Sequence, residues 1–262
     1  MGSAAPPMSK WNFWVDELPR PGWANMAIDQ ALLDRADRHG ESWLRLYYWA
    51  PFCLSFGRHE PARRLYDLER ISALAVDTVR RPTGGRAVWH ARELTYALAA
   101  PSFRFGSLRA AYLAIHHMLA DALRELGVPA SLAPTVRALP LDAGGCFSQP
   151  AGGEIMVEGR KVVGSAQLRQ GTALLQHGSI LLEDNQDFVG VLTRNPRPPD
   201  PTSSTSIPQR SLEAREVVEA VTCAAGARWG GTWEPISHQE AILSSASNHF
   251  AHFRSNAWTW AR

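Results

Sequence analysis

The chain has 262 residues, 45% of them hydrophobic, and its 27 basic residues nearly balance its 25 acidic ones. This length is enough to bury one large core. The even balance excludes a nucleic-acid binder that relies on general basicity, because phosphate neutralisation needs an excess of lysine and arginine. No apolar run reaches the roughly 20 residues that a membrane span needs. We therefore expect neither nucleic acid nor a membrane as a partner.

The N-terminal half predicts mainly strands, with one long helix and one short one. Residues 1–10 have no apolar stretch and are expected to form a flexible tail, and residues 11–262 the folded domain. Alternating apolar residues predict strands and a 3.6-residue period predicts helices. In chain order we expect a strand over 11–18, a helix over 22–40, strands over 43–49 and 52–58, a short helix over 60–74, a strand–turn–strand unit over 77–90 and a strand over 93–101.

The C-terminal half predicts a long helix, three strands and two late helices. In chain order these are a helix over 107–127, three strands within 153–183, an exposed Pro/Ser/Thr-rich loop over 194–209, and helices over 211–230 and 237–253. Strands often follow one another instead of alternating with helices. The order therefore predicts a single α+β domain with a mixed, largely antiparallel sheet packed by helices.

The segment RRPTGGRAVWH, residues 80–90, combines positive charge with a sharp turn. Gly84 and Gly85 allow backbone angles that other residues avoid, so the chain can approach a ligand closely. Arg80, Arg81 and Arg86 could then hold an anionic group. The alternative is a tight hairpin with solvated arginines.

Two other segments carry candidate chemistry. In GRKVVGSAQ, Lys161 could direct its ammonium at a carbonyl oxygen that gains negative charge during a reaction, or it could be a solvated strand residue. Gly164, Ser165 and Ala166 are small enough to leave a groove beside the sheet. In DAGGCFSQP, Cys146 lies in a glycine-rich loop and is either an inert buried thiol or an ionised nucleophile.

The three cysteines do not suggest a structural role as a set. Cys53, Cys146 and Cys223 are too few and too scattered for a disulfide framework or a CxxC metal site. They fit a reducing, cytoplasmic setting.

Together with NMAIDQALL near the N-terminus, these segments resemble the lipoate–protein ligase and octanoyltransferase family, whose fold is biotin/lipoate protein ligase-like. The resemblance covers roughly residues 11–262. Arg86 stands where ATP-using ligases usually carry a third glycine, and Cys146 falls where cysteine-dependent octanoyltransferases carry their nucleophile. The QHG of LLQHGSILL, which contains His177, also resembles that branch. Two departures are Ala91, where an aspartate is common, and the glycine-rich approach to Cys146.

The resemblance implies an acyltransferase that needs no cofactor. Its donor would be octanoyl-acyl carrier protein, and its acceptor a lysine of a lipoyl domain or of the glycine-cleavage H protein. A thioester is already activated, so Cys146 could take the octanoyl group as an S-acyl intermediate without ATP.

The resemblance also implies roles for single residues. Lys161 would face the acyl carbonyl and lower the pKa of the Cys146 thiol. Val88 and Val163 would line an apolar tunnel. His90 is either a proton-transfer residue or a hydrogen-bonded residue at a strand end. The expected substrate-binding residues are Arg80, Arg81, Thr83, Gly84, Gly85, Arg86, Val88, Val163, Gly164, Ser165, Ala166 and His177.

The three arginines have two possible tasks, which are to bind the phosphopantetheine phosphate or to form salt links within the fold. Three rival functions remain. They are an ATP- and Mg-dependent lipoate–protein ligase, a lipoyl amidotransferase, and a non-catalytic acyl-binding module on the same scaffold.

Overall fold

The structure is a computed structural model, and it describes residues 10–134, 152–198, 212–236 and 239–261. Residues 1–9 of the expected tail, most of the Pro/Ser/Thr-rich loop and the segment that carries Cys146 lie outside these residues, whereas Lys10, which was expected in the tail, is the first residue of a strand. Among the helices of these four ranges, none is both long and apolar enough to cross a membrane.

Two β-sheets organise the molecule. The larger has eight strands in the order β11 (Thr232–Pro235), β1 (Lys10–Arg20), β2 (Trp43–Trp49), β6 (Glu93–Pro101), β10 (Ala173–Leu181), β9 (Arg160–Gln170), β8 (Ile155–Val157) and β7 (Ser131–Leu132). Strand β1 pairs in parallel with β11 and β2, and the remaining neighbours pair antiparallel. The smaller sheet has the order β4 (Asp77–Arg80), β3 (Cys53–Phe56) and β5 (Val88–His90).

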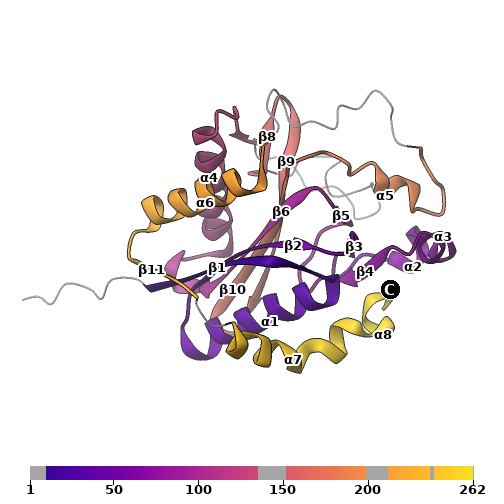
Figure 1. Cartoon of the computed structure of the whole chain (residues 1–262), viewed down its shortest axis with the longest axis horizontal. Coiled ribbons are helices and arrows are strands. Elements are labelled where there is room, and N and C mark those ends of the chain that lie inside the picture. Colours follow the sequence, from indigo (N-terminus) through magenta and orange to yellow (C-terminus); the bar gives the residue numbers. More distant parts are fainter. Residues whose placement is uncertain (1–9, 135–151, 199–211, 237–238, 262) are drawn as a thin grey trace, which may run out of the picture.

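Helices cover both faces of the large sheet (Figure 1). One face packs against α4 (Leu108–Glu125) and α6 (Ala214–Trp229), and the other against α1 (Gly22–His39) and α7 (Glu240–Arg254). Strand β6 shows why both faces are apolar, because Leu94, Tyr96 and Leu98 enter the α4 core while Ala97 and Ala99 enter the α1 core. Successive strand residues point to opposite faces, so a strand buried on both sides reads as a continuous apolar run.

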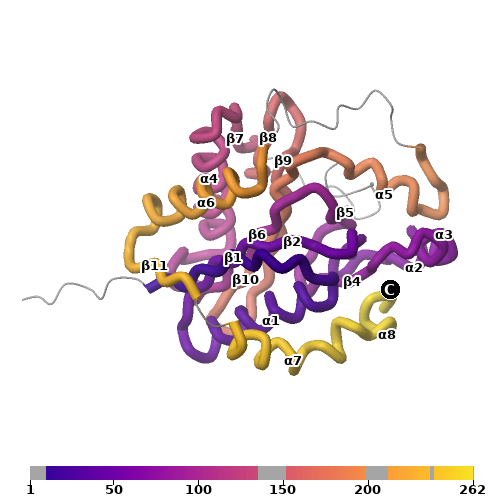
Figure 2. Tube along the Cα trace, viewed as in Figure 1, coloured from indigo at the N-terminus to yellow at the C-terminus, as the bar shows by residue number. Residues whose placement is uncertain are grey.

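The small sheet closes one end of the molecule. It packs with the short helices α2 (Ala62–Leu65), α3 (Leu68–Ala73), α5 (Phe188–Val191) and α8 (Asn256–Thr259). Figure 2 shows α8, near the C-terminus, beside β4, which lies far from it in the sequence. A 3-10 turn, η1 (Ser102–Arg104), follows β6.

The α+β class and the mixed sheet are confirmed, while several short elements differ from the prediction, among them the helices α5 and α8, which were not predicted. The helix expected over 60–74 is divided into α2 and α3. Tyr66 leaves the helix to bridge Thr193, and the Asp67 side chain then accepts from the Arg70 amide to start α3. Strands β7 and β11 were not predicted, because two and four residues are too short to show an alternating pattern.

Candidate functional site

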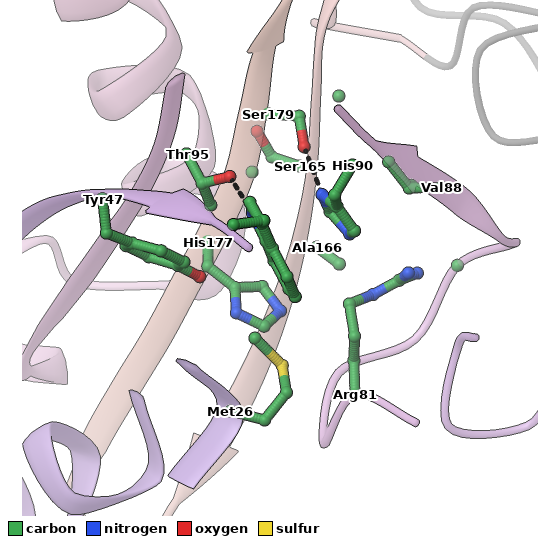
Figure 3. A pocket seen from close by; sticks show the side chains of 14 residues that line it. Met26, Tyr47, Arg81, Val88, His90, Thr95, Ser165, Ala166, His177 and Ser179 are labelled. Atoms are coloured by element: carbon green, nitrogen blue, oxygen red, sulfur yellow. Dashed lines mark hydrogen bonds between the residues drawn. The ribbon is translucent and has the colours of Figure 1, made fainter. Parts of the chain in front are cut away.

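A cavity that is partly open to solvent lies where α1, the large sheet and the small sheet meet (Figure 3), and the empty space in and in front of it amounts to roughly 390 Å³. Its wall consists of Met26, Tyr47, Trp49, Arg81, Gly85, Val88, His90, Thr95, Gly164, Ser165, Ala166, His177, Gly178 and Ser179. Eight of the expected substrate-binding or catalytic residues therefore share one wall, namely Arg81, Gly85, Val88, His90, Gly164, Ser165, Ala166 and His177. Residues as far apart in the sequence as Met26 and Ser179 therefore meet here.

On the α1 side of the cavity, polar side chains converge on one buried carboxylate, Asp29. It accepts from Arg45 Nη1 at 3.0 Å and from the Tyr47 hydroxyl at 2.9 Å. His177 binds it through Nδ1 at 2.9 Å, and its other ring nitrogen meets Thr83 Oγ1 at 2.6 Å. The polar atoms of Tyr47 and His177 are thus already satisfied by protein groups.

On the opposite side of the cavity, Glu93 is the buried carboxylate that accepts the hydrogen bonds of the polar side chains. Its Oε1 accepts from His90 Nδ1 at 2.7 Å, from Thr95 Oγ1 at 2.6 Å and from Ser179 Oγ at 2.8 Å. Trp49 Nε1 in turn donates to Thr95 Oγ1 at 2.7 Å. Many lining residues are polar by type, yet their hydrogen bonds turn back into the protein, so the wall offers mainly apolar surface to a ligand.

His90 is held at both ring nitrogens. Nδ1 binds Glu93, and Nε2 lies 2.6 Å from Ser55 Oγ, while the ring stacks on Trp49 at 3.8 Å between centroids. Burial lowers the pKa of His90; Glu93 opposes this effect and the nearby Arg81 adds to it. This geometry favours the hydrogen-bonded strand-end interpretation over proton transfer.

Arg80 and Arg81 are buried and bind within the fold. Arg81 donates to the carbonyls of Ser55 at 2.9 Å and Arg86 at 2.8 Å, and to that of Gly84 at 3.2 Å. The carbonyl partners of Arg80 belong to Gly57, Arg58, Glu60, Trp258 and Thr259. For these two arginines the internal alternative fits better than phosphate binding. Arg86 is half-buried.

One residue of the Gly-Gly turn, Gly85, lines the cavity, whereas Gly84 is not part of the wall. Gly85 has a φ of +91°, which favours glycine, and a Cβ on Gly57 would lie 1.8 Å from the Gly85 carbonyl oxygen. Val88 lines the cavity, as expected. Val163 does not, because its side chain belongs to the core shared with α4. The expected tunnel contact of Val163 is therefore corrected.

Lys161 lies outside this cavity wall, at the start of β9. Its Nζ is 2.6 Å from Glu154 Oε1, and the side chains of this pair are 1% and 6% exposed. The solvated-strand alternative for Lys161 is therefore excluded. A buried lysine needs such a partner, because an uncompensated buried charge is costly. Cys146, the predicted nucleophile, lies outside the described residues.

Asp29, Glu93 and Glu154 are not among the predicted site residues, and the sequence gives no reason to assign a role to His116. Asp29 sits inside the quoted NMAIDQALL segment, and Glu93 is the only charged residue in the apolar run ELTYALAAP. Both signals were available. His116 carries no such signal, because a single histidine within a long amphipathic helix does not show which groups it will contact. Among the described residues, no group of three or more His, Cys, Asp or Glu side chains could hold a metal ion.

Comparison with known proteins gives one consistent family. The model of the lipoyl protein ligase A/B catalytic domain matches residues 21–225. Octanoyltransferase LipM of Carboxydothermus hydrogenoformans is 41% identical over 185 residues, which cover 69% of this chain and 68% of that protein. Octanoyltransferase LipM of Brevibacillus brevis is 34% identical over 249 residues, which cover 90% and 84% respectively.

Solved structures agree on the fold. A protein of T. acidophilum described as a lipoate protein ligase, with bound lipoic acid, has a TM-score of 0.77 at 19% identity and covers 96% of this chain and 100% of its own. A lipoate-protein ligase A bound with ATP has a TM-score of 0.78 at 19% identity, covering 96% and 99%. At this identity the likeness concerns the fold alone, and it confirms the expected architecture.

Proposed function

This chain belongs to the lipoyl protein ligase A/B catalytic domain family, and from that premise we infer that it is an octanoyltransferase of lipoate biosynthesis. The observation that carries the inference is the cavity wall, whose polar side chains form their hydrogen bonds with other protein groups and not toward the cavity. The surface that remains is mainly apolar and suits an alkyl chain. The relatives named octanoyltransferase support the same acyl group.

Chemically, the reaction is two successive acyl transfers. The Cys146 thiolate attacks the thioester carbonyl of octanoyl-acyl carrier protein, and the carrier thiol leaves with a proton. The amine of an acceptor lysine, on a lipoyl domain or the glycine-cleavage H protein, then attacks the Cys146 thioester. The amide forms, the amine loses a proton, and the cysteine sulfur is released. Because the donor is already activated, the cycle needs neither ATP nor Mg, and the cytoplasm is its expected setting.

Lys161 is assigned to the reacting carbonyl. A buried ammonium can stabilise the oxyanion of each tetrahedral intermediate and favour the thiolate of Cys146. Glu154 limits the net charge at that point to that of an ion pair. The alkyl chain occupies the cavity, beneath the backbone at Gly85 and against Val88 and the small residues Gly164 and Ala166.

The test is intact-mass measurement of the pure protein after mixing with octanoyl-acyl carrier protein. We expect one octanoyl group per chain, located by peptide mapping on Cys146. Cys146→Ala should abolish both the adduct and transfer to a lipoyl domain. Cys223→Ala is the matched control, because Cys223 is an exposed free cysteine and should leave the adduct intact.

Three results would assign another function. Turnover that requires lipoate and ATP but no carrier protein would make the chain a ligase. Transfer only from an already octanoylated lipoyl domain would make it an amidotransferase. Binding of octanoate with no adduct and no transfer would leave a binding module.

A further inference from the structure

His116, on α4, is fully buried and uses both ring nitrogens. Nδ1 lies 2.5 Å from the Gly153 carbonyl oxygen, and Nε2 lies 2.7 Å from Ser165 Oγ. Gly153 directly precedes Glu154, the partner of Lys161, whereas Ser165 belongs to the cavity wall. One side chain therefore joins the two parts of the site.

The direction of these hydrogen bonds follows from their partners. The Gln176 amide donates to the Tyr96 hydroxyl oxygen at 2.8 Å, so the Tyr96 hydroxyl proton points to Ser165 Oγ at 2.6 Å. The Ser165 hydroxyl then donates to His116 Nε2. Since a carbonyl only accepts, His116 Nδ1 carries the proton that reaches Gly153. The imidazole is therefore neutral, and burial agrees by lowering the pKa of His116 to about 4.

The backbone at Gly153 lies directly on α4. Its φ is +89°, and a Cβ there would lie 3.1 Å from Leu113 Cδ2 and 3.3 Å from Tyr112 Cε1. The Tyr112 ring also lies 4.0 Å from the His116 ring, between centroids. Helix α4 thus packs directly against the Gly153–Glu154 segment. The backbone of that segment also pairs with Ala133, and His116 provides the side-chain hydrogen bond that joins it to α4.

We propose that His116 is a positioning residue that holds the Glu154–Lys161 pair in a fixed place relative to Ser165 on the cavity wall. The proposal rests on the proposed function for the role of Lys161 and of the cavity. His116 acts through the Gly153 backbone and does not touch the substrate. A shift of about 1 Å in a reacting group can cost about a hundredfold in rate, so a single attachment of this kind has a measurable effect.

Three substitutions separate the two hydrogen bonds. His116→Phe keeps the ring and removes both, His116→Asn keeps a donor near the Nδ1 position, and His116→Gln places an amide near the Nε2 position. We expect His116→Phe to slow acyl-enzyme formation about a hundredfold with little change in KM. His116→Asn should recover most of the rate, and His116→Gln should not. His117→Phe is the matched control, because His117 is exposed on the same helix and should behave as the wild type.

A second measurement does not depend on the reaction. The sequence has only two lysines, Lys10 and Lys161, so the acetylation of Lys161 by acetic anhydride can be measured against Lys10 by peptide mass spectrometry. The Lys10 side chain is 59% exposed, whereas that of Lys161 is 1% exposed. His116→Phe should raise the Lys161/Lys10 ratio several-fold in a protein whose thermal midpoint shows that it is folded, and His116→Asn should restore the wild-type ratio.

The outcomes are distinct. A wild-type protein that forms no acyl-enzyme contradicts the proposed function, and the acetylation ratio then still decides the proposal about His116. An unchanged ratio in folded His116→Phe overturns that proposal, whatever the activity. A loss of rate shared equally by the Asn, Gln and Phe variants also overturns it, because only general packing would then explain the loss.

Discussion

The cavity wall and the region around Lys161 differ in where their polar and charged groups point. Around the cavity, the polar side chains turn away from the ligand and converge on Asp29 and Glu93. Beside it, Lys161 and Glu154 keep two charged groups in contact at 2.6 Å inside the protein. The wall is built so that a ligand meets little polarity, whereas the ion pair preserves a charge at a buried point.

Under the proposed function, the cavity wall serves binding and the ion pair serves chemistry. An alkyl chain gains free energy when it leaves water for a surface that makes no polar demands. A developing oxyanion, by contrast, is stabilised by charge that is already oriented and needs no reorganisation. Substitutions in the two regions should therefore affect different kinetic constants.

The largest expected effect comes from the ion pair. Lys161→Ala removes the proposed oxyanion donor and leaves Glu154 buried without its ammonium, so acyl-enzyme formation should slow by about a hundredfold or more with KM little changed. Rapid-quench intact mass measures the rate. Lys10→Ala, the other lysine, is the control and should be neutral. A loss below a few-fold would reduce Lys161 to a structural residue.

A smaller effect is expected from the wall. Thr95→Val keeps the shape but removes the acceptor of Trp49 Nε1, which then requires water in the cavity. An entering alkyl chain displaces that water, so octanoate affinity measured by calorimetry should fall about tenfold, which corresponds to about 1.4 kcal/mol. Thr95→Ser retains the hydroxyl and should bind as the wild type does. If Thr95→Val bound octanoate as tightly as the wild type, the hydrogen bond of Trp49 to Thr95 would not be what keeps the cavity wall apolar.

A prediction of a different kind concerns folding stability and not activity, namely the pH dependence that His116 gives to the free energy of unfolding. Its folded pKa of about 4 lies below the ordinary 6.5, so the unfolded chain binds a proton that the folded chain excludes. The stabilisation is complete above pH 6.5 and is lost as pH falls toward 4, by about 1.4 kcal/mol per pH unit at the steepest.

Urea unfolding of the wild type and of His116→Phe at several pH values gives the free energy of unfolding of each protein as a function of pH. The contribution of His116 is the difference between the slopes of these two pH curves. Subtracting the two curves removes the acid sensitivity of the carboxylates and of His90, which both proteins share. His117→Phe should retain the wild-type slope. Parallel curves for wild type and His116→Phe would show that His116 titrates alike in the folded and unfolded states.

The sequence was sufficient for the fold and for most of the cavity. Strongly periodic segments such as 107–127 gave α4 almost to the residue, and the small residues Gly164, Ser165 and Ala166 do line a groove beside the sheet. Both results depend on local patterns, namely an apolar helical face and side-chain size, which a single sequence displays directly.

The hydrogen-bond partners of buried side chains could not be predicted, because many of them lie far away in the sequence. Arg80 and Arg81 looked like ligand-binding cations because a sequence shows charge but not burial, and the carbonyl groups that satisfy Arg80 come from positions 57–60 and 258–259. The prediction that Val163 lines the tunnel was wrong for a related reason. Alternation along a strand indicates two faces, but it does not say which face borders the cavity.

The contacts of Arg80 also set an order for assembly during synthesis. Its side chain is fully buried, and the guanidinium takes two of its acceptors from the carbonyls of Trp258 and Thr259 in α8. A nascent chain that stops short of these residues leaves that buried cation without two of its acceptors. We therefore expect the small sheet to reach its full stability only after the residues of α8 have been translated.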